Sequence, residues 1–158
     1  MKTLRYGARV TLLALLCLAA SVSTARAETR VGIRGGLSID PDQFLIGLSI
    51  QPPPVAQNLY LVPSIEGGFG DDLVSIAFNG DLQYQFGRSG GVRPYAGGGL
   101  AITYWNADNG GDDTELGVNA LGGLLFDRTS GAPIFLEMKL GLSDEVPDWK
   151  FVVGLMFR

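Results

Sequence analysis

The chain has 158 residues, a net charge of −4 and no histidine, and 46% of its residues are hydrophobic. Without histidine, Ser-His and Cys-His nucleophilic sites and most zinc sites are excluded, because they need imidazole as a base or a ligand. The acidic charge balance also argues against nucleic-acid binding, which needs a basic surface to neutralise phosphates.

Residues 1–27 have the pattern of a secretory signal peptide. The segment opens with basic residues, residues 10–20 are almost entirely apolar, and Ala25 and Ala27 supply the small residues that precede a cleavage site. The apolar run is too short to cross a membrane as a helix, which takes about 20 residues. An uncleaved N-terminal anchor is the alternative. Cleavage after Ala27 leaves residues 28–158 as one domain with a net charge of −8, and it removes the only cysteine.

Eight segments of the remaining chain alternate apolar and polar residues with a period of two, which is typical of strands with one apolar face. Most are longer than the usual strands of soluble proteins, and they reach the roughly 9–11 residues that a transmembrane strand needs. In chain order, the predicted strands cover residues 30–39, 43–51, 58–69, 73–86, 92–105, 115–126, 133–143 and 149–158.

The charged residues within these segments all lie on the parity opposite the large apolar residues. In a membrane barrel this arrangement turns the charges inward and avoids a cost of roughly 2–4 kcal/mol for each charge that faces lipid at mid-depth. A soluble sheet with its apolar face enclosed would show the same alternation, so it stays open as an alternative. The residues concerned are Arg34, Glu66, Asp81, Arg93, Glu137, Lys139 and Lys150.

Acidic residues gather in every second connection between the predicted strands. In an up-and-down antiparallel sheet these connections lie together at one end. They hold 11 of the 16 acidic residues and no lysine or arginine. Two interpretations are open: solvated loops, or a weak divalent-cation bridge to the phosphates of lipopolysaccharide, since carboxylates bind Ca²⁺. The four acidic connections are residues 40–42, 70–72, 106–115 and 144–148.

The interior charges predict a network of ion pairs. Side chains largely fill the interior of an eight-stranded barrel, so we expect these pairs to plug it, and a narrow or gated pore is the alternative. Ion pairing also explains the interior carboxylates better than a catalytic pair does, and we expect no enzymatic activity, no cofactor and no metal site. The expected pairs join Glu66, Asp81 and Glu137 to Arg34, Lys139 and Lys150.

Two sequence features carry a resemblance to a known class of proteins. Residues 93–99 read Arg-Pro-Tyr-Ala-Gly-Gly-Gly, and the terminal segment places an aromatic residue just before Arg158. With the signal peptide and eight strands, they make the chain similar to the small eight-stranded outer-membrane barrels, such as the barrel domain of the outer membrane protein A family. The resemblance implies that the barrel-assembly machinery reads the last strand. The residues carried over as that signal are Phe151, Val153, Leu155 and Phe157.

The sequence therefore predicts an all-β protein, an eight-stranded antiparallel up-and-down transmembrane β-barrel of the outer membrane. The expected role is structural or surface-exposed and non-catalytic. The expected partners are outer-membrane lipid, lipopolysaccharide and the assembly machinery, without nucleic acid, and we expect a monomer. Two alternatives stay open: a narrow small-solute channel, and a soluble periplasmic lipocalin-like barrel that binds an apolar ligand.

Overall fold

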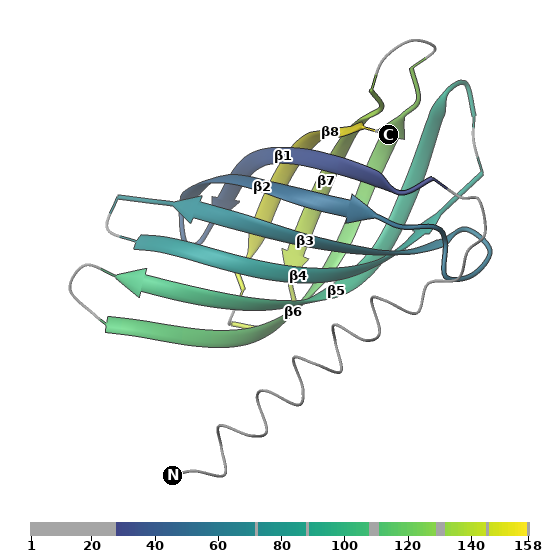
Figure 1. The fold of residues 1–158 in the computed structure, drawn as a ribbon. Coiled ribbons are helices and arrows are strands. Elements are labelled where there is room, and N and C mark those ends of the chain that lie inside the picture. The colour runs from purple at the N-terminus through teal and green to yellow at the C-terminus, as the bar shows by residue number, and fades with distance from the viewer. Residues whose placement is uncertain are drawn as a thin grey trace.

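The structure is a computed structural model that describes residues 28–71, 73–87, 89–107, 111–128, 132–144 and 146–157. The predicted signal peptide, residues 1–27, lies outside the described residues. Eight antiparallel strands form one closed barrel in chain order (Figure 1). They are β1 (Arg30–Ile39), β2 (Gln43–Gln51), β3 (Leu59–Phe69), β4 (Leu73–Gln85), β5 (Val92–Ala107), β6 (Gly111–Phe126), β7 (Ile134–Gly141) and β8 (Trp149–Phe157).

The barrel closes through β1, which pairs with β2 on one side and with β8 on the other. Val31 lies opposite Phe157 and Ile39 lies opposite Trp149, so the first and last strands are joined over almost their whole length. Closure satisfies the backbone hydrogen bonds of the part of the wall in which every strand pairs on both sides. The predicted eight-stranded antiparallel up-and-down barrel is confirmed.

Three predicted strand boundaries differ from the structure by two residues or more. β5 ends at Ala107 and not at residue 105. β6 begins at Gly111 and not at residue 115, because the acidic stretch that was assigned to a loop pairs with the last residues of β5. β7 ends at Gly141 and not at residue 143. There the Leu142 N–H donates to the carbonyl of Val118, and the chain turns away from the β7–β8 ladder.

The large apolar side chains of the strands point outward, and the opposite parity faces the interior. Along β4, exposed and buried residues alternate from Val74 to Gln85. Among the described residues, the large apolar side chains that are exposed far outnumber those that are buried. This arrangement is the reverse of what the soluble lipocalin-like alternative requires. It is the arrangement of a barrel whose surroundings are apolar.

Within the part of the chain that the structure describes, no helix is long and apolar enough to cross a membrane.

Candidate functional site

The six charged residues singled out from the sequence lie together inside the barrel. Each sits on the inward parity of its strand, and each is buried. The strands bring them in from different sides of the barrel: Arg34 comes from β1, Glu66 from β3, Asp81 from β4, Glu137 and Lys139 from β7, and Lys150 from β8.

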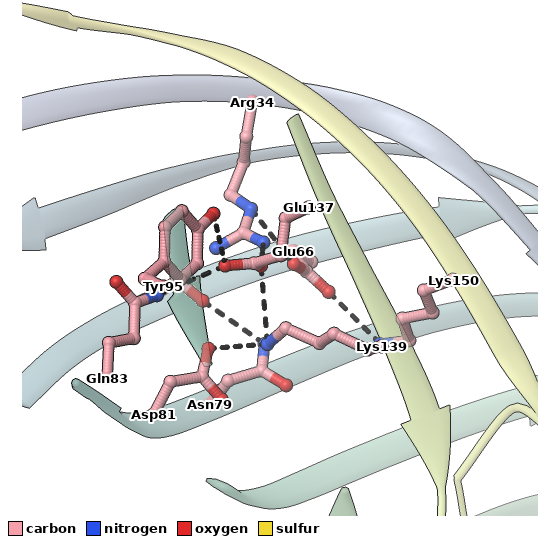
Figure 2. A network of polar contacts seen from close by, with 10 residues as sticks. Arg34, Glu66, Asn79, Asp81, Gln83, Tyr95, Glu137, Lys139 and Lys150 are labelled. Atoms are coloured by element: carbon pink, nitrogen blue, oxygen red, sulfur yellow. Dashed lines mark hydrogen bonds and ion pairs between the residues drawn. The ribbon is translucent and has the colours of Figure 1, made fainter. Parts of the chain in front are cut away.

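Arg34 joins two acids that come from separate strands (Figure 2). Its Nη2 atom donates a hydrogen bond of 2.6 Å to Oε1 of Glu137, and its Nε atom lies 3.1 Å from Oε1 of Glu66. The other oxygen of Glu66, Oε2, accepts a hydrogen bond of 3.1 Å from Nζ of Lys150. Glu66 therefore bridges β1 and β8 through two cations.

Lys139 completes the network on the far side of Glu137. Its Nζ atom donates to Oδ2 of Asp81 over 2.5 Å and lies 4.0 Å from Oε1 of Glu137. Three cations thus face three acids, and the network has no net charge. Desolvating these charges is costly, so their stability depends on each charge keeping its partners.

Two neutral side chains saturate Glu137, and the sequence did not identify them as members of the network. Gln83 Nε2 and the Tyr95 hydroxyl both donate to Oε2 of Glu137, over 3.1 Å and 3.0 Å. Figure 2 shows these two side chains converging on the same oxygen of the carboxylate. Tyr95 lies on the inward parity of β5, but its partner lies on β7, which is not a neighbour of β5. Strand pairing alone does not predict such a contact.

Below the charges, an apolar cluster fills the end of the interior that holds both chain termini. Its members lie on the same parity as the charges, and the sequence analysis missed it. The Phe135 ring lies beneath the Arg34 guanidinium, with 5.7 Å between the guanidinium carbon and the ring centroid, a distance at which a cation–π attraction operates. Two inward glycines make room for the rings, since a Cβ at Gly123 would meet Tyr95 and one at Gly154 would meet Phe135. The cluster comprises Tyr95, Leu121, Leu125, Phe135, Val152 and Met156.

The opposite end of the interior is covered by the connection between β7 and β8. Val146 and Pro147 are buried there, and Val146 packs against Gly117, where there is no room for a Cβ. Beneath them is a small cavity of about 10 Å³, lined among others by Trp105, Pro147 and Lys150. The charged network is therefore covered at both ends by packed side chains.

The described residues of the acidic connections do not form a metal site. Asp40, Asp42, Asp71, Asp144 and Asp148 are exposed. Within the described residues, no group of three acidic, histidine or cysteine side chains is arranged to hold a metal ion. Three further acids of these connections, at positions 72, 108 and 145, lie outside the described residues.

The predicted assembly-signal residues lie on the outer face of β8. Phe151, Val153 and Phe157 are exposed and Leu155 is half-buried, and the aromatic ring of Trp149 stacks on that of Phe151. Arg158, which follows the last aromatic residue, lies outside the described residues. The structure therefore places these side chains where an apolar environment or a partner reaches them, and it does not test the assembly signal itself.

The fold, with its apolar exterior and charged interior, is that of the small eight-stranded outer-membrane barrels. No protein-family model matches the sequence, and no curated protein matches it either. Solved structures do match. The N-terminal barrel domain of Pseudomonas aeruginosa OprF is 24% identical with a TM-score of 0.66, over 82% of this chain and 96% of that domain.

Two further structures of this class are similar. Neisserial surface protein A is 16% identical with a TM-score of 0.60, over 81% of this chain and 92% of that one. The Yersinia pestis outer membrane protein Ail is 13% identical with a TM-score of 0.50, over 82% of this chain and all of that one, at 100%. At these identities the likeness shows the fold and leaves the activity open.

Proposed function

We propose that the mature chain is an integral outer-membrane protein with a structural or surface-exposed role, and that its interior is closed to solutes. One observation carries this proposal: six buried charges of zero net charge are tied together from five strands across the barrel. A solute path would have to separate these pairs, and removing one partner of a buried pair costs about 3–5 kcal/mol.

Two other features support a closed interior. The apolar cluster around Phe135 lies between the network and the terminal end, and Val146 and Pro147 cover the loop end. A path for water needs polar surface along its whole length, and the apolar cluster interrupts that surface. The narrow-channel alternative has no comparable feature in its favour among the described residues.

The proposed absence of catalysis rests on the chemistry of the interior. The chain has no histidine. Each of the interior carboxylates Glu66, Asp81 and Glu137 holds at least one cation within 3.1 Å. A carboxylate held in this way is a poor general base, because its lone pairs are already occupied.

Membrane insertion is tested by cell fractionation, followed by denaturing gel electrophoresis of detergent-extracted protein with and without boiling. We expect the protein in the outer-membrane fraction, a mobility shift on boiling, and an N-terminus at Glu28 by mass spectrometry. A soluble periplasmic protein without the shift would overturn the proposal.

Whether the interior is closed to solutes is tested by recording the ionic current through planar bilayers that contain the purified barrel. We expect no discrete conductance steps from the wild-type protein. If steps occur and Lys139→Met changes their size, the barrel is a channel. Steps from a contaminating porin would not change with the substitution, so the variant separates the two cases.

A further inference from the structure

The outer half of β6 lacks a partner on one of its two sides. β5 pairs with β6 over the full length of both strands, from Val92↔Phe126 to Ala107↔Gly111. On the other side, the pairing with β7 begins only at Asn119. β4 stays paired with β5 up to Leu73↔Ala107, whereas β7 ends at Gly141, so the wall is short only on the β7 side and the outer half of β6 forms a free edge there (Figure 1).

The hydrogen bonds at Val118 show which backbone groups face this edge. Val118 N–H donates to Ser143 Oγ over 3.1 Å, and its carbonyl accepts from Leu142 N–H over 2.9 Å, so the backbone of Val118 points away from β5. Antiparallel pairing alternates with a period of two, and the backbones of Leu116 and Thr114 therefore point the same way.

These two residues leave hydrogen-bonding groups open. Thr114 N–H donates to its neighbour Asp113, to Oδ1 over 2.7 Å. Among the described residues, no such bond reaches the backbone N–H or carbonyl of Leu116, or the carbonyl of Thr114, on this side. The Leu116 side chain is 62% exposed beside them. The edge thus offers backbone donors and acceptors next to an apolar side chain.

Charge determines which kind of chain fits this edge. Asp113 and Glu115 project from the same stretch of β6, and the neighbouring connection adds the exposed Asp144. A second copy of this chain would place like charges opposite one another, which destabilises cross-strand pairs. A strand that carries lysine or arginine on alternate positions would face these acids with opposite charge.

We propose that residues 113–117 of β6 bind an extended basic peptide by strand addition. The peptide backbone pairs with Thr114 and Leu116, one face of the peptide packs an apolar side chain against Leu116, and the other presents cations to Asp113 and Glu115. Main-chain hydrogen bonds provide the affinity in this mode of recognition, and alternate side chains provide the specificity. The edge is preorganised, since β5 holds β6 in an extended conformation without the peptide.

The test measures binding of a fluorescein-labelled heptapeptide that alternates lysine with valine to the full barrel in nanodiscs, by fluorescence anisotropy. Leu116→Pro removes the edge N–H, and proline is tolerated where that group faces away from the sheet. Leu116→Ala is the matched control, because it shortens the side chain and keeps the N–H. We expect proline to weaken binding about tenfold more than alanine does.

A second measurement covers the case in which Leu116→Pro fails to fold, which the boiling-dependent gel shift reports. The same heptapeptide with N-methylated alternate residues, added to the wild-type barrel, should also bind about tenfold more weakly. The double variant Asp113→Asn with Glu115→Gln should weaken binding and reduce its salt dependence. Equal binding of the parent and N-methylated peptides would overturn strand addition and leave attraction to the acidic loops alone. No binding of the parent peptide would overturn the site.

Discussion

Replacing Lys139 with methionine tests the interior network at its most enclosed pair. The Asp81 side chain is fully buried, and Lys139 Nζ is its ion-pair partner at 2.5 Å. Methionine keeps most of the length of the lysine side chain and removes the charge, so Asp81 is left as a buried carboxylate without its cation. We expect a loss of about 3–5 kcal/mol in the free energy of unfolding. Adding Asp81→Asn to the variant removes the stranded charge and should recover at least about 2 kcal/mol.

The assay is urea unfolding of the barrel in detergent micelles or lipid vesicles, followed by the fluorescence of Trp105 and Trp149. Arg93→Met is the matched control, because the Arg93–Asp127 pair spans 2.9 Å but is partly exposed, with 23% of the arginine side chain accessible. Partly exposed pairs contribute at most about 1 kcal/mol. If Lys139→Met costs no more than Arg93→Met, or if the double variant is less stable than Lys139→Met, the network does not hold the barrel together.

Three further predictions concern packing and metal binding. Gly123→Val should lower the free energy of unfolding by about 2–3 kcal/mol in the same urea assay, because the new side chain overlaps the Tyr95 ring. The control is Gly80→Val, which has open space around the Cβ position and should change the free energy of unfolding by less than about 1 kcal/mol. Phe135→Ala should cost about 3–5 kcal/mol, since it removes a buried ring from the apolar cluster; a loss below about 1 kcal/mol would show that the cluster is loosely packed. Millimolar Ca²⁺ should leave the melting temperature unchanged, and a rise of several degrees would reveal a cation site in the acidic loops.

The strand pattern of this barrel could be predicted from the sequence because each strand meets two different environments. Side chains alternate across a strand, so alternate residues in the sequence differ in polarity according to the face on which they lie. The Gly-rich strand β5 shows this well. Ala96, Leu100 and Ile102 on one parity are exposed, and Tyr95 and Thr103 on the other are buried. The start of β6 was harder to predict, because its acidic residues resemble a solvated loop and only their pairing with β5 makes them a strand.

The membership of the charged network was predictable, but its partner choices were not. Counting charges on the inward parity identifies three acids and four cations, and the fourth cation, Arg93, pairs with Asp127 outside the network. Which acid meets which cation depends on the stagger of the strands around the barrel, and Arg34 reaches Glu137 although β7 is not a neighbour of β1. The apolar cluster was missed for a different reason. Leu121, Leu125 and Phe135 share the inward parity with polar residues, and the alternation pattern does not show that they meet in one cluster.

The same alternation fits a membrane barrel and a soluble one, and the capacity of the interior decides between them. An eight-stranded barrel encloses only enough space for its inward side chains to fill. Here that space is occupied by the charged network, the apolar cluster around Phe135 and the residues beneath Pro147. The outward side chains include bulky residues on every strand, and they have no place inside. A barrel that enclosed the outward apolar side chains would have to be wider than this one. The existing barrel therefore needs an apolar environment around it, with its polar side chains inside.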